Sequence, residues 1–417
     1  LPLVINGSSP TTYVSPNATW RWVEHTYDPL ERITQVQYPD ARTVSTSFQD
    51  WVRTVTDERG HDKRFKNDGL GRLIQVEEMD AGNTFTTIYT YDPVDQLIEI
   101  QDHETNLWRF TYDTLGRRIH RTDPDLGDWS YVYDHAGNLI ERTDARGEIV
   151  QYSYDELNRL KTKTYASTNT LHEYFYGSDL NTQNGLGRRT KMVDLSGETI
   201  WFYDNEGRVV REEKTVTGEV APFVIEYVYD ALDRVTRAIY PNTRQVDFTY
   251  NKQGFVESIP GFLINGDYTA FGQSQSFSYA NNVTTDYFYH NDNQRLLQIQ
   301  STPFMDMNYQ YDAVGNISQI REDVRGWTND YTYDDLNRLL TGDGETFAYD
   351  AIGNIIDRNG VLQLYEGSQP HALTFDGNAT YIYDEVGNML SGAGRTISYD
   401  AENHPVQIDR AGVMTQL

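Results

Sequence analysis

The chain has 417 residues, contains no cysteine and carries a net charge of −27, with an isoelectric point near 4.6. The absence of cysteine excludes disulfides and thiolate metal sites. The acidity argues against a partner that is nucleic acid or an anionic membrane surface, because both need basic side chains to neutralise phosphates.

The first 26 residues precede any recognisable repeat. We interpret residues 1–26 as a lead-in to the first repeat. They begin Leu1-Pro2-Leu3, without an initiating Met or a basic leader, which is typical of a piece cut from a longer chain. No apolar run in the whole sequence reaches 18 residues, so we expect no membrane-spanning helix.

A Tyr-Asp motif then organises the chain. Copies begin at Tyr91, Tyr112, Tyr133 and Tyr154, each 21 residues after the last. A fixed period of this length indicates stacked structural units rather than separate globular domains.

The motif predicts a β-hairpin. Phe110-Thr111-Tyr112 has the alternation of a half-buried strand, and Asp113 stands where a type I turn favours Asp. Gly116 then closes the turn in the left-handed region, as in a hairpin with a type I turn and a one-residue bulge. Aligned in this way, 17 units begin at Tyr27, Asn67, Tyr91, Tyr112, Tyr133, Tyr154, Gln183, Tyr203, Tyr229, Tyr250, Tyr268, Tyr289, Tyr311, Tyr333, Tyr349, Tyr383 and Tyr399.

The closing position is mostly a residue that tolerates positive φ. It is Gly in ten units, Asn in four (Asn158, Asn293, Asn337, Asn403), Asp in two (Asp95, Asp233) and Glu only at Glu31. We therefore predict either strain or another turn type at Glu31, and positive φ at most of Asn158, Asn337, Asp95 and Asp233 and at Gly71, Gly116, Gly137, Gly207, Gly315, Gly353 and Gly387.

The hairpin geometry also predicts cross-strand pairs. Asp faces the residue after the closing position, commonly Arg, and Tyr faces the next residue, commonly aliphatic. We expect one face of the strip to carry Tyr against aliphatic side chains and the other to carry Asp against Arg. Each pair is worth about 0.2–1 kcal/mol, so stability requires many repeats.

The repeat spacing divides the chain into regions. Regular repeats occupy 27–165, a loop-rich irregular repeat 166–190, and repeats with a variant stretch at 255–290 occupy 191–345. Residues 346–417 have altered spacing and an insert, Tyr365 to Leu373, which indicates a cap or a change of curvature.

The sequence contains no recognisable catalytic, metal-binding or cofactor-binding motif, and we therefore expect a non-enzymatic chain without a cofactor. The run from Asp123 to Asp128 lacks the length and closing Glu of a calcium loop and is interpreted as a turn. The scattered histidines are interpreted as surface residues. The seven tryptophans leave open the alternative that their rings stack on bound sugars, although packing of these rings on the sheet is favoured.

The residues on which the prediction rests are therefore structural positions of the repeat. They are Tyr112, Asp113, Gly116, Arg117, Tyr133, Asp134, Gly137, Tyr154, Asp155, Asn158, Tyr203, Asp204, Gly207, Tyr311, Asp312, Gly315, Tyr383, Asp384 and Gly387.

These Tyr-Asp-x-x-Gly-Arg repeats resemble those of the RHS/YD-repeat family, which includes bacterial Rhs toxins, the B and C components of Tc insecticidal toxins, and teneurins. The resemblance covers residues 27 to about 404. The segments from Gly367 to Leu373, Tyr383 to Met389 and Tyr399 to Pro405 resemble the region just upstream of the family's core domain. That core domain, with the aspartyl autoprotease of some members, is expected to lie outside this chain.

The resemblance implies an all-β fold, in which antiparallel hairpins form a continuous spiralling sheet as part of a hollow shell. The implied function is a structural segment of a secreted bacterial toxin that encapsulates a C-terminal effector until delivery. Its partners would be that effector and the remaining shell segments, in a secreted or cell-surface location. The alternative, allowed by teneurins, is an adhesion or carbohydrate-binding module.

Elementary dimensions limit what this chain encloses alone. About 34 strands at about 4.8 Å each make a strip roughly 160 Å wide, which would close into a ring only about 50 Å across. One such ring stands about 17–20 Å tall. We therefore predict an open, partial shell of one to two turns with unpaired edge strands at both ends.

Overall fold

The computed structural model describes residues 22–177 and 184–416, and these residues form strands and turns with no helix. Accordingly, no helix in the described part of the chain could cross a membrane. The all-β prediction is confirmed. The unit predicted to begin at Gln183 starts just outside the described residues, as do Trp20 and most of the lead-in.

The strands follow one another along the chain in five sheets, and within each sheet every strand pairs antiparallel with the next one in the sequence. The first sheet has 21 strands: β1 (Glu24–Tyr27), β2 (Ile33–Gln37), β3 (Thr43–Gln49), β4 (Val52–Thr56), β5 (Asp62–Asn67), β6 (Leu73–Asp80), β7 (Asn83–Tyr91), β8 (Leu97–Gln101), β9 (Leu107–Tyr112), β10 (Arg118–Asp123), β11 (Gly127–Tyr133), β12 (Leu139–Thr143), β13 (Ile149–Tyr154), β14 (Leu160–Tyr165), β15 (Thr170–Tyr176), β16 (Arg189–Asp194), β17 (Gly197–Tyr203), β18 (Val209–Val216), β19 (Phe223–Tyr229), β20 (Val235–Ile239) and β21 (Gln245–Asp247).

Four smaller sheets continue the strip, with two, seven, five and five strands. They contain β22 (Thr249–Tyr250) and β23 (Val256–Ser258); β24 (Leu263–Tyr268), β25 (Ser274–Tyr279), β26 (Thr284–Tyr289), β27 (Leu296–Ser301), β28 (Met305–Tyr311), β29 (Ile317–Glu322) and β30 (Trp327–Asp330); β31 (Thr332–Tyr333), β32 (Leu339–Gly342), β33 (Glu345–Tyr349), β34 (Ile355–Arg358) and β35 (Val361–Leu362); and β36 (Ile382–Tyr383), β37 (Met389–Gly392), β38 (Arg395–Tyr399), β39 (Pro405–Arg410) and β40 (Val413–Gln416).

The predicted turn is present in the repeats. In the Tyr154 unit, the Asn158 N–H donates to Asp155 O at 3.0 Å and the Asp155 N–H to Arg159 O at 3.0 Å, while a bulge sets Tyr154 opposite Leu160. Positive φ is confirmed at Gly71, Gly116, Gly137, Gly207, Gly315, Gly353, Gly387, Asn158, Asn337, Asp95 and Asp233, and it also occurs at the closing residues Glu31, Gly187, Gly254, Gly272 and Asn403. Glu31 adopts the same turn at φ 61°, so it is a left-handed non-glycine residue rather than part of another turn type.

The assignment of Asn293 as the closing residue of the Tyr289 unit is wrong. The loop after Tyr289 has one extra residue: the His290 N–H donates to Arg295 O, and the Gln294 N–H donates back to His290 O. The left-handed position therefore moves to Gln294, with φ 58°. The added residue displaces the closing position without changing its backbone requirement.

The expected separation of Tyr and Arg onto two faces is also wrong. The Arg117 Nε bonds the Asp113 carboxylate at 2.7 Å, as predicted, but its guanidinium also lies 4.9 Å from the Tyr133 ring centroid. Its Nη1 donates to Asp134 O at 3.0 Å. The long Arg side chain thus reaches from one unit to the next and joins them.

The tyrosine hydroxyls make the second link between units. The Tyr154 hydroxyl donates to Leu139 O at 2.8 Å and the Tyr229 hydroxyl to Val209 O at 2.7 Å, each reaching the preceding hairpin. Burial of the ring raises the pKa of both phenols. Each repeat Tyr of this kind therefore packs its ring on the sheet and satisfies its polar end.

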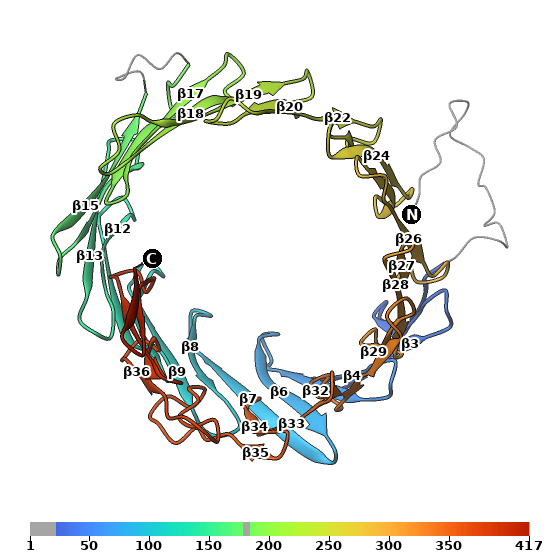
Figure 1. The fold of residues 1–417 in the computed structure, drawn as a ribbon. Helices are drawn as coiled ribbons and strands as arrows, with labels where there is room; N and C mark the ends of the chain where they lie inside the picture. Colours follow the sequence, from blue (N-terminus) through green and yellow to red (C-terminus); the bar gives the residue numbers. More distant parts are fainter. Residues whose placement is uncertain (1–21, 178–183, 417) are drawn as a thin grey trace.

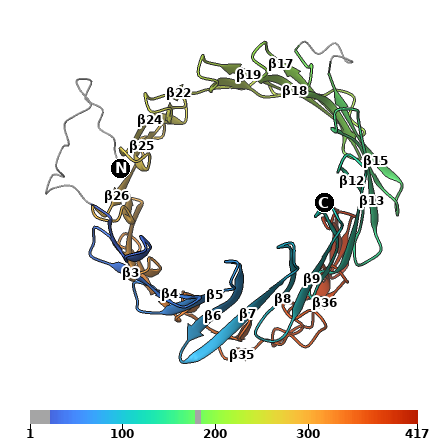
Figure 2. The same ribbon diagram turned by 180° about the vertical axis from the view of Figure 1, so that it is seen from behind.

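The strip curves into a ring that does not close, and its C-terminal strands overlap its N-terminal strands. β29 to β36 lie along β3 to β9 in both views (Figures 1 and 2). In the described residues β1 pairs only with β2, and β40 only with β39. The predicted open shell of one to two turns, with unpaired edges, is confirmed.

Candidate functional site: the seam between coils

The strip has two rims, because successive hairpin turns alternate between its two edges. The Tyr-Asp rim consists of the turns that follow the repeat tyrosines, such as 113–116, and the distal rim of the turns at the other strand ends, such as 124–126. Where the strip overlaps itself, the Tyr-Asp rim of the second coil (residues 289–404) contacts the distal rim of the first (residues 38–170). We call this contact the seam.

At one end of the seam, Asp40 and Arg42 meet the turns after Tyr289 and Tyr311. The Asn293 Nδ2 donates to Asp40 Oδ2 at 2.9 Å, and Arg42 donates to Ala313 O. Burial alone would raise the pKa of Asp40, but the hydrogen bonds from Asn293 and Arg42 outweigh it and hold that pKa below its usual value. Burial and the nearby Arg42 charge lower the pKa of Arg295.

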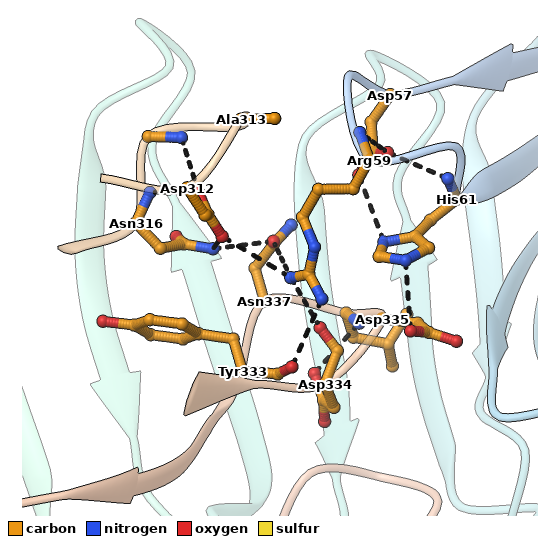
Figure 3. Close-up of polar contacts among 12 residues, drawn as sticks. Asp57, Arg59, His61, Asp312, Ala313, Asn316, Tyr333, Asp334, Asp335 and Asn337 are labelled. Atoms are coloured by element: carbon orange, nitrogen blue, oxygen red, sulfur yellow. Dashed lines mark hydrogen bonds and ion pairs between the residues drawn. The ribbon is translucent and has the colours of Figure 1, made fainter. Parts of the chain in front are cut away.

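Arg59 is the next contact and reaches into two turns of the second coil (Figure 3). Its guanidinium donates to Asp334 O at 3.1 Å and to Tyr333 O at 3.3 Å, and it lies 3.6 Å from the Asp312 carboxylate. The Asp57 carboxylate fixes the Arg59 turn by accepting the backbone N–H of Arg59 at 2.8 Å. A guanidinium shared in this way ties the two turns to one point of the first coil.

His61 lies beside Arg59 in the same view. Its Nε2 is 3.1 Å from Asp335 Oδ1, and its Nδ1 is 3.5 Å from Asp57 Oδ2. The side chain is only 20 % exposed. The interpretation of His61 as a surface residue is therefore wrong, because a second coil covers it.

Asp80 makes a reciprocal contact with the same turn. Its Oδ2 accepts the Arg338 Nη2 at 2.9 Å, and its Oδ1 accepts the Asp335 N–H at 3.2 Å. The Ala81 N–H in turn donates to Asp335 Oδ2 at 3.1 Å. Each coil thus supplies a carboxylate to a backbone donor of the other.

The run from Asp123 to Asp128 contains the distal turn 124–126 between β10 and β11, which confirms its interpretation as a turn. The Asp125 carboxylate accepts the His371 N–H at 2.9 Å and lies 2.7 Å from its Nδ1. Gln369 donates to Asp125 O at 2.9 Å. The insert from Tyr365 to Leu373 is therefore part of the seam. Among the described residues no His, Asp and Glu cluster is arranged to hold a metal ion.

The backbone of the second coil also lies close to the first coil beside this turn. A Cβ on Gly127 would lie 2.5 Å from the Ala145 Cβ and 2.9 Å from Glu385 O, so only glycine fits. Val386, in the opposing turn, is 4 % exposed. This is one of the few places where the strip buries an apolar side chain.

The last seam contact centres on Glu402. Its carboxylate lies 3.2 Å from the Arg142 guanidinium and 2.8 Å from the Lys163 Nζ. Tyr165 beside it is 5 % exposed, and its pKa is raised by burial and by the Glu402 charge. This pair of cations therefore holds the final Tyr-Asp turn against β12 and β14.

The predicted repeat positions divide between two roles. Those in the first coil, such as Asp113 and Asp155, hold their own turns, whereas Asp312 and Asp384 also face cations of the other coil, at 3.6 Å and 3.7 Å. Sequence reasoning missed the partners from the first coil. Seam hydrogen bonds join residues 244 to 278 positions apart, so no local pattern signals them.

The tryptophans for which packing is described do not form a free row for glycans. Trp129 is 8 % exposed between Arg121 and Arg142, and the Trp201 indole N–H donates to Glu212 at 2.9 Å. Trp51 and Trp327 are more exposed, at 60 % and 36 %, but Trp51 lies in the turn between β3 and β4 and Trp327 lies in β30 of another sheet. The packing interpretation holds for Trp129 and Trp201.

Comparisons with known proteins agree with this architecture. The RHS Repeat family model matches residues 91–126 and 133–170. A curated relative, toxin subunit YenC1 of Yersinia entomophaga, is 33 % identical over a match that covers 19 % of this chain and 10 % of the relative. The crystal structure of TcdB2-TccC3 superposes with a TM-score of 0.83 at 18 % identity, covering 92 % of this chain and 25 % of that one.

A second solved structure gives the same result. The Tc holotoxin pore of Photorhabdus luminescens, in a mutant of TccC3, matches with a TM-score of 0.83 at 17 % identity, covering 92 % of this chain and 24 % of that one. The chain thus shares its fold with the matched parts of these solved chains. The chain spans about a quarter of the length of the solved chains and a tenth of the curated relative.

Proposed function

We propose that this chain, which belongs to the RHS/YD-repeat family, is a wall segment of a secreted toxin shell that encloses an effector domain and keeps it sequestered until delivery. The observation that carries the proposal is the seam. It makes the strip climb as a spiral, with the second coil seated on the first, so that each added coil extends one continuous wall.

The proposed role is structural and not catalytic. The charged groups of the seam are committed to contacts between coils, as Arg59 and Glu402 show. Hydrogen bonds to charged groups contribute about 1.5–3 kcal/mol each, so several of them fix the curvature of the wall. The partners of the segment would be the effector and the remaining shell segments.

The test uses the product of the complete reading frame that encodes this chain. Electron cryomicroscopy should show the described coils as part of a larger wall with additional density inside it. Limited proteolysis should leave the enclosed domain uncut in the intact particle and cut it rapidly after the shell is unfolded in urea.

Two results would contradict the proposal. One is a reading frame, together with its neighbours, that encodes no effector domain. The other is an effector equally sensitive to protease before and after the shell is unfolded.

A further inference from the structure

The His61 ring stands between two carboxylates, one from each coil (Figure 3). Its Nε2 is 3.1 Å from Asp335 Oδ1 of the second coil, and its Nδ1 is 3.5 Å from Asp57 Oδ2 of its own turn. Nδ1 is buried, and within the described part of the chain it has no hydrogen-bond partner. A buried nitrogen of this kind needs an explanation, because an unsatisfied polar group destabilises a fold.

The protonation state of the ring supplies that explanation. A neutral imidazole has one N–H and one lone pair, whereas an imidazolium has two N–H groups. With its proton on Nε2, a neutral His61 donates to Asp335 but directs the lone pair of Nδ1 at the Asp57 carboxylate. With its proton on Nδ1, the lone pair of Nε2 meets Asp335 instead. Only the imidazolium presents an N–H to both carboxylates.

The charged groups around His61 also favour the imidazolium. The charged side chains that share its cleft are Arg53, Asp57, Asp62, Lys63, Glu78 and Asp335, and Arg59 lies beside them. Of the cations, Lys63 pairs with Glu78 at 2.6 Å, and Arg59 lies 3.6 Å from Asp312 of the second coil. Three carboxylates then remain for one cation, Arg53. A positive charge on the ring reduces this excess of negative charge.

A second histidine of the seam does not need the charge. The His371 Nδ1 lies 2.7 Å from Asp125 Oδ2, and a neutral ring that carries its proton on Nδ1 satisfies this contact. His61 differs from it because a carboxylate faces each of its two ring nitrogens.

We propose that His61 is a pH-dependent latch, which holds the turn 334–337 of the second coil more tightly against the first coil when the imidazole is protonated. By linkage, the closed seam and the bound proton favour each other. The added stability is fully present at acid pH, where the ring is charged in the closed and the open seam alike. It is lost as the pH rises through the range of about 5 to 8 in which histidine gives up its charge. This inference concerns the seam alone and does not depend on what the shell encloses.

The backbone N–H of Asp335 reports the state of the latch, because it donates across the seam to Asp80 Oδ1 at 3.2 Å. Hydrogen exchange of this amide should be measured from about pH 5 to about pH 8 and compared with the exchange of an unstructured peptide at the same pH. The ratio of the two rates gives the protection of the amide. This protection should fall about five- to tenfold across the range, because a hydrogen bond between charged groups is stronger than a neutral one.

Two variants should remove the pH dependence in different ways. His61→Gln still donates a hydrogen bond but carries no charge, so protection should stay near the value that the original chain has at the alkaline end. Asp57→Asn keeps an oxygen for the backbone N–H groups of Arg59 and His61, and it offers an amide N–H to the lone pair of Nδ1. A neutral ring is then satisfied, so protection should vary little with pH and exceed that of the original chain at the alkaline end.

The matched control is His120→Gln, because the His120 Nε2 faces Asp128 Oδ1 at 3.7 Å inside the first coil. In this variant the protection of Asp335 should follow that of the original chain at every pH. Protection that does not vary with pH in the original chain would overturn the proposal. A pH dependence that survives in His61→Gln or in Asp57→Asn, or one that disappears in the control, would also overturn it.

Discussion

Arg338 donates through Nη2 to the Asp80 carboxylate at 2.9 Å, which joins two residues 258 positions apart in the chain. Contacts of this kind turn a curved strip into a spiral wall. Neither residue belongs to a catalytic constellation. The pair belongs to a seam whose strength can be measured by removing one side of it.

Replacement of Asp80 by Ala should loosen the seam. The variant loses the acceptor of both the Arg338 guanidinium and the Asp335 N–H, at a cost of about 2–3 kcal/mol in the local opening free energy. Hydrogen exchange of the Asp335 amide should accelerate by one to two orders of magnitude. Glu99→Ala, which removes a pair with Arg109 inside one coil, is the control and should leave that amide unchanged. If the Asp335 amide exchanged at the same rate in the Asp80→Ala variant as in the original chain, the contact between the two coils would be contradicted.

Replacement of Gly116 by Val should destabilise the first coil through the backbone alone. Its φ is 77° and a Cβ there meets no atom within 4 Å, so the added side chain has space but an unfavourable conformation. The expected loss in unfolding free energy is about 1–3 kcal/mol in urea titration. Gly116→Asn should cost less, because Asn158 and Asn337 occupy the same position at φ 59° and 64°. A Val variant as stable as the Asn variant would be inconsistent with the turn assignment.

Acid should destabilise the repeats through their turn carboxylates. The hydrogen bond from the Arg159 side chain lowers the pKa of Asp155, and the backbone N–H of Arg117, ahead of its side chain, helps lower that of Asp113. Because these folded pKa values lie below the ordinary 3.8, the carboxylates contribute stability above that pH and lose it as the pH falls through the folded values.

Urea midpoints measured between pH 6 and pH 3 should therefore fall mainly below about pH 4. Asp155→Asn should flatten part of that fall. A midpoint that is constant down to pH 3 would exclude the turn carboxylates as the cause.

Replacement of Tyr229 by Phe should weaken the link between hairpins and preserve the sheet. The variant loses the 2.7 Å bond from the hydroxyl to Val209 O and keeps the ring, at a cost of about 0.5–1.5 kcal/mol in unfolding free energy. Tyr174→Phe is the comparison, since Tyr174 is a strand tyrosine outside the repeat position, and it should cost less. Equal losses of unfolding free energy in the two variants would show that the Tyr229 hydroxyl does not link the two hairpins.

Sequence alone determined the local unit. Tyr154-Asp155 and Asn158 specify the turn, its left-handed residue and the register of Tyr154 against Leu160, because a backbone with positive φ restricts which residues it accepts. The repetition of that unit then determined an all-β strip. The one wrong closing residue, Asn293, also has a local cause. Its loop is longer by one residue, so the positive φ falls on Gln294 instead.

Only the tertiary structure decided where the strip meets itself. His61 and His371 look like isolated surface residues in the sequence, and each faces a carboxylate of another coil. Leu115 and Val386 occupy the same turn position, yet one is 73 % exposed and the other 4 %. The difference in exposure comes from the curvature of the strip, which brings together residues 244 to 278 positions apart. That curvature accumulates over many hairpins, so no single turn or strand pair in the sequence specifies where the coils meet.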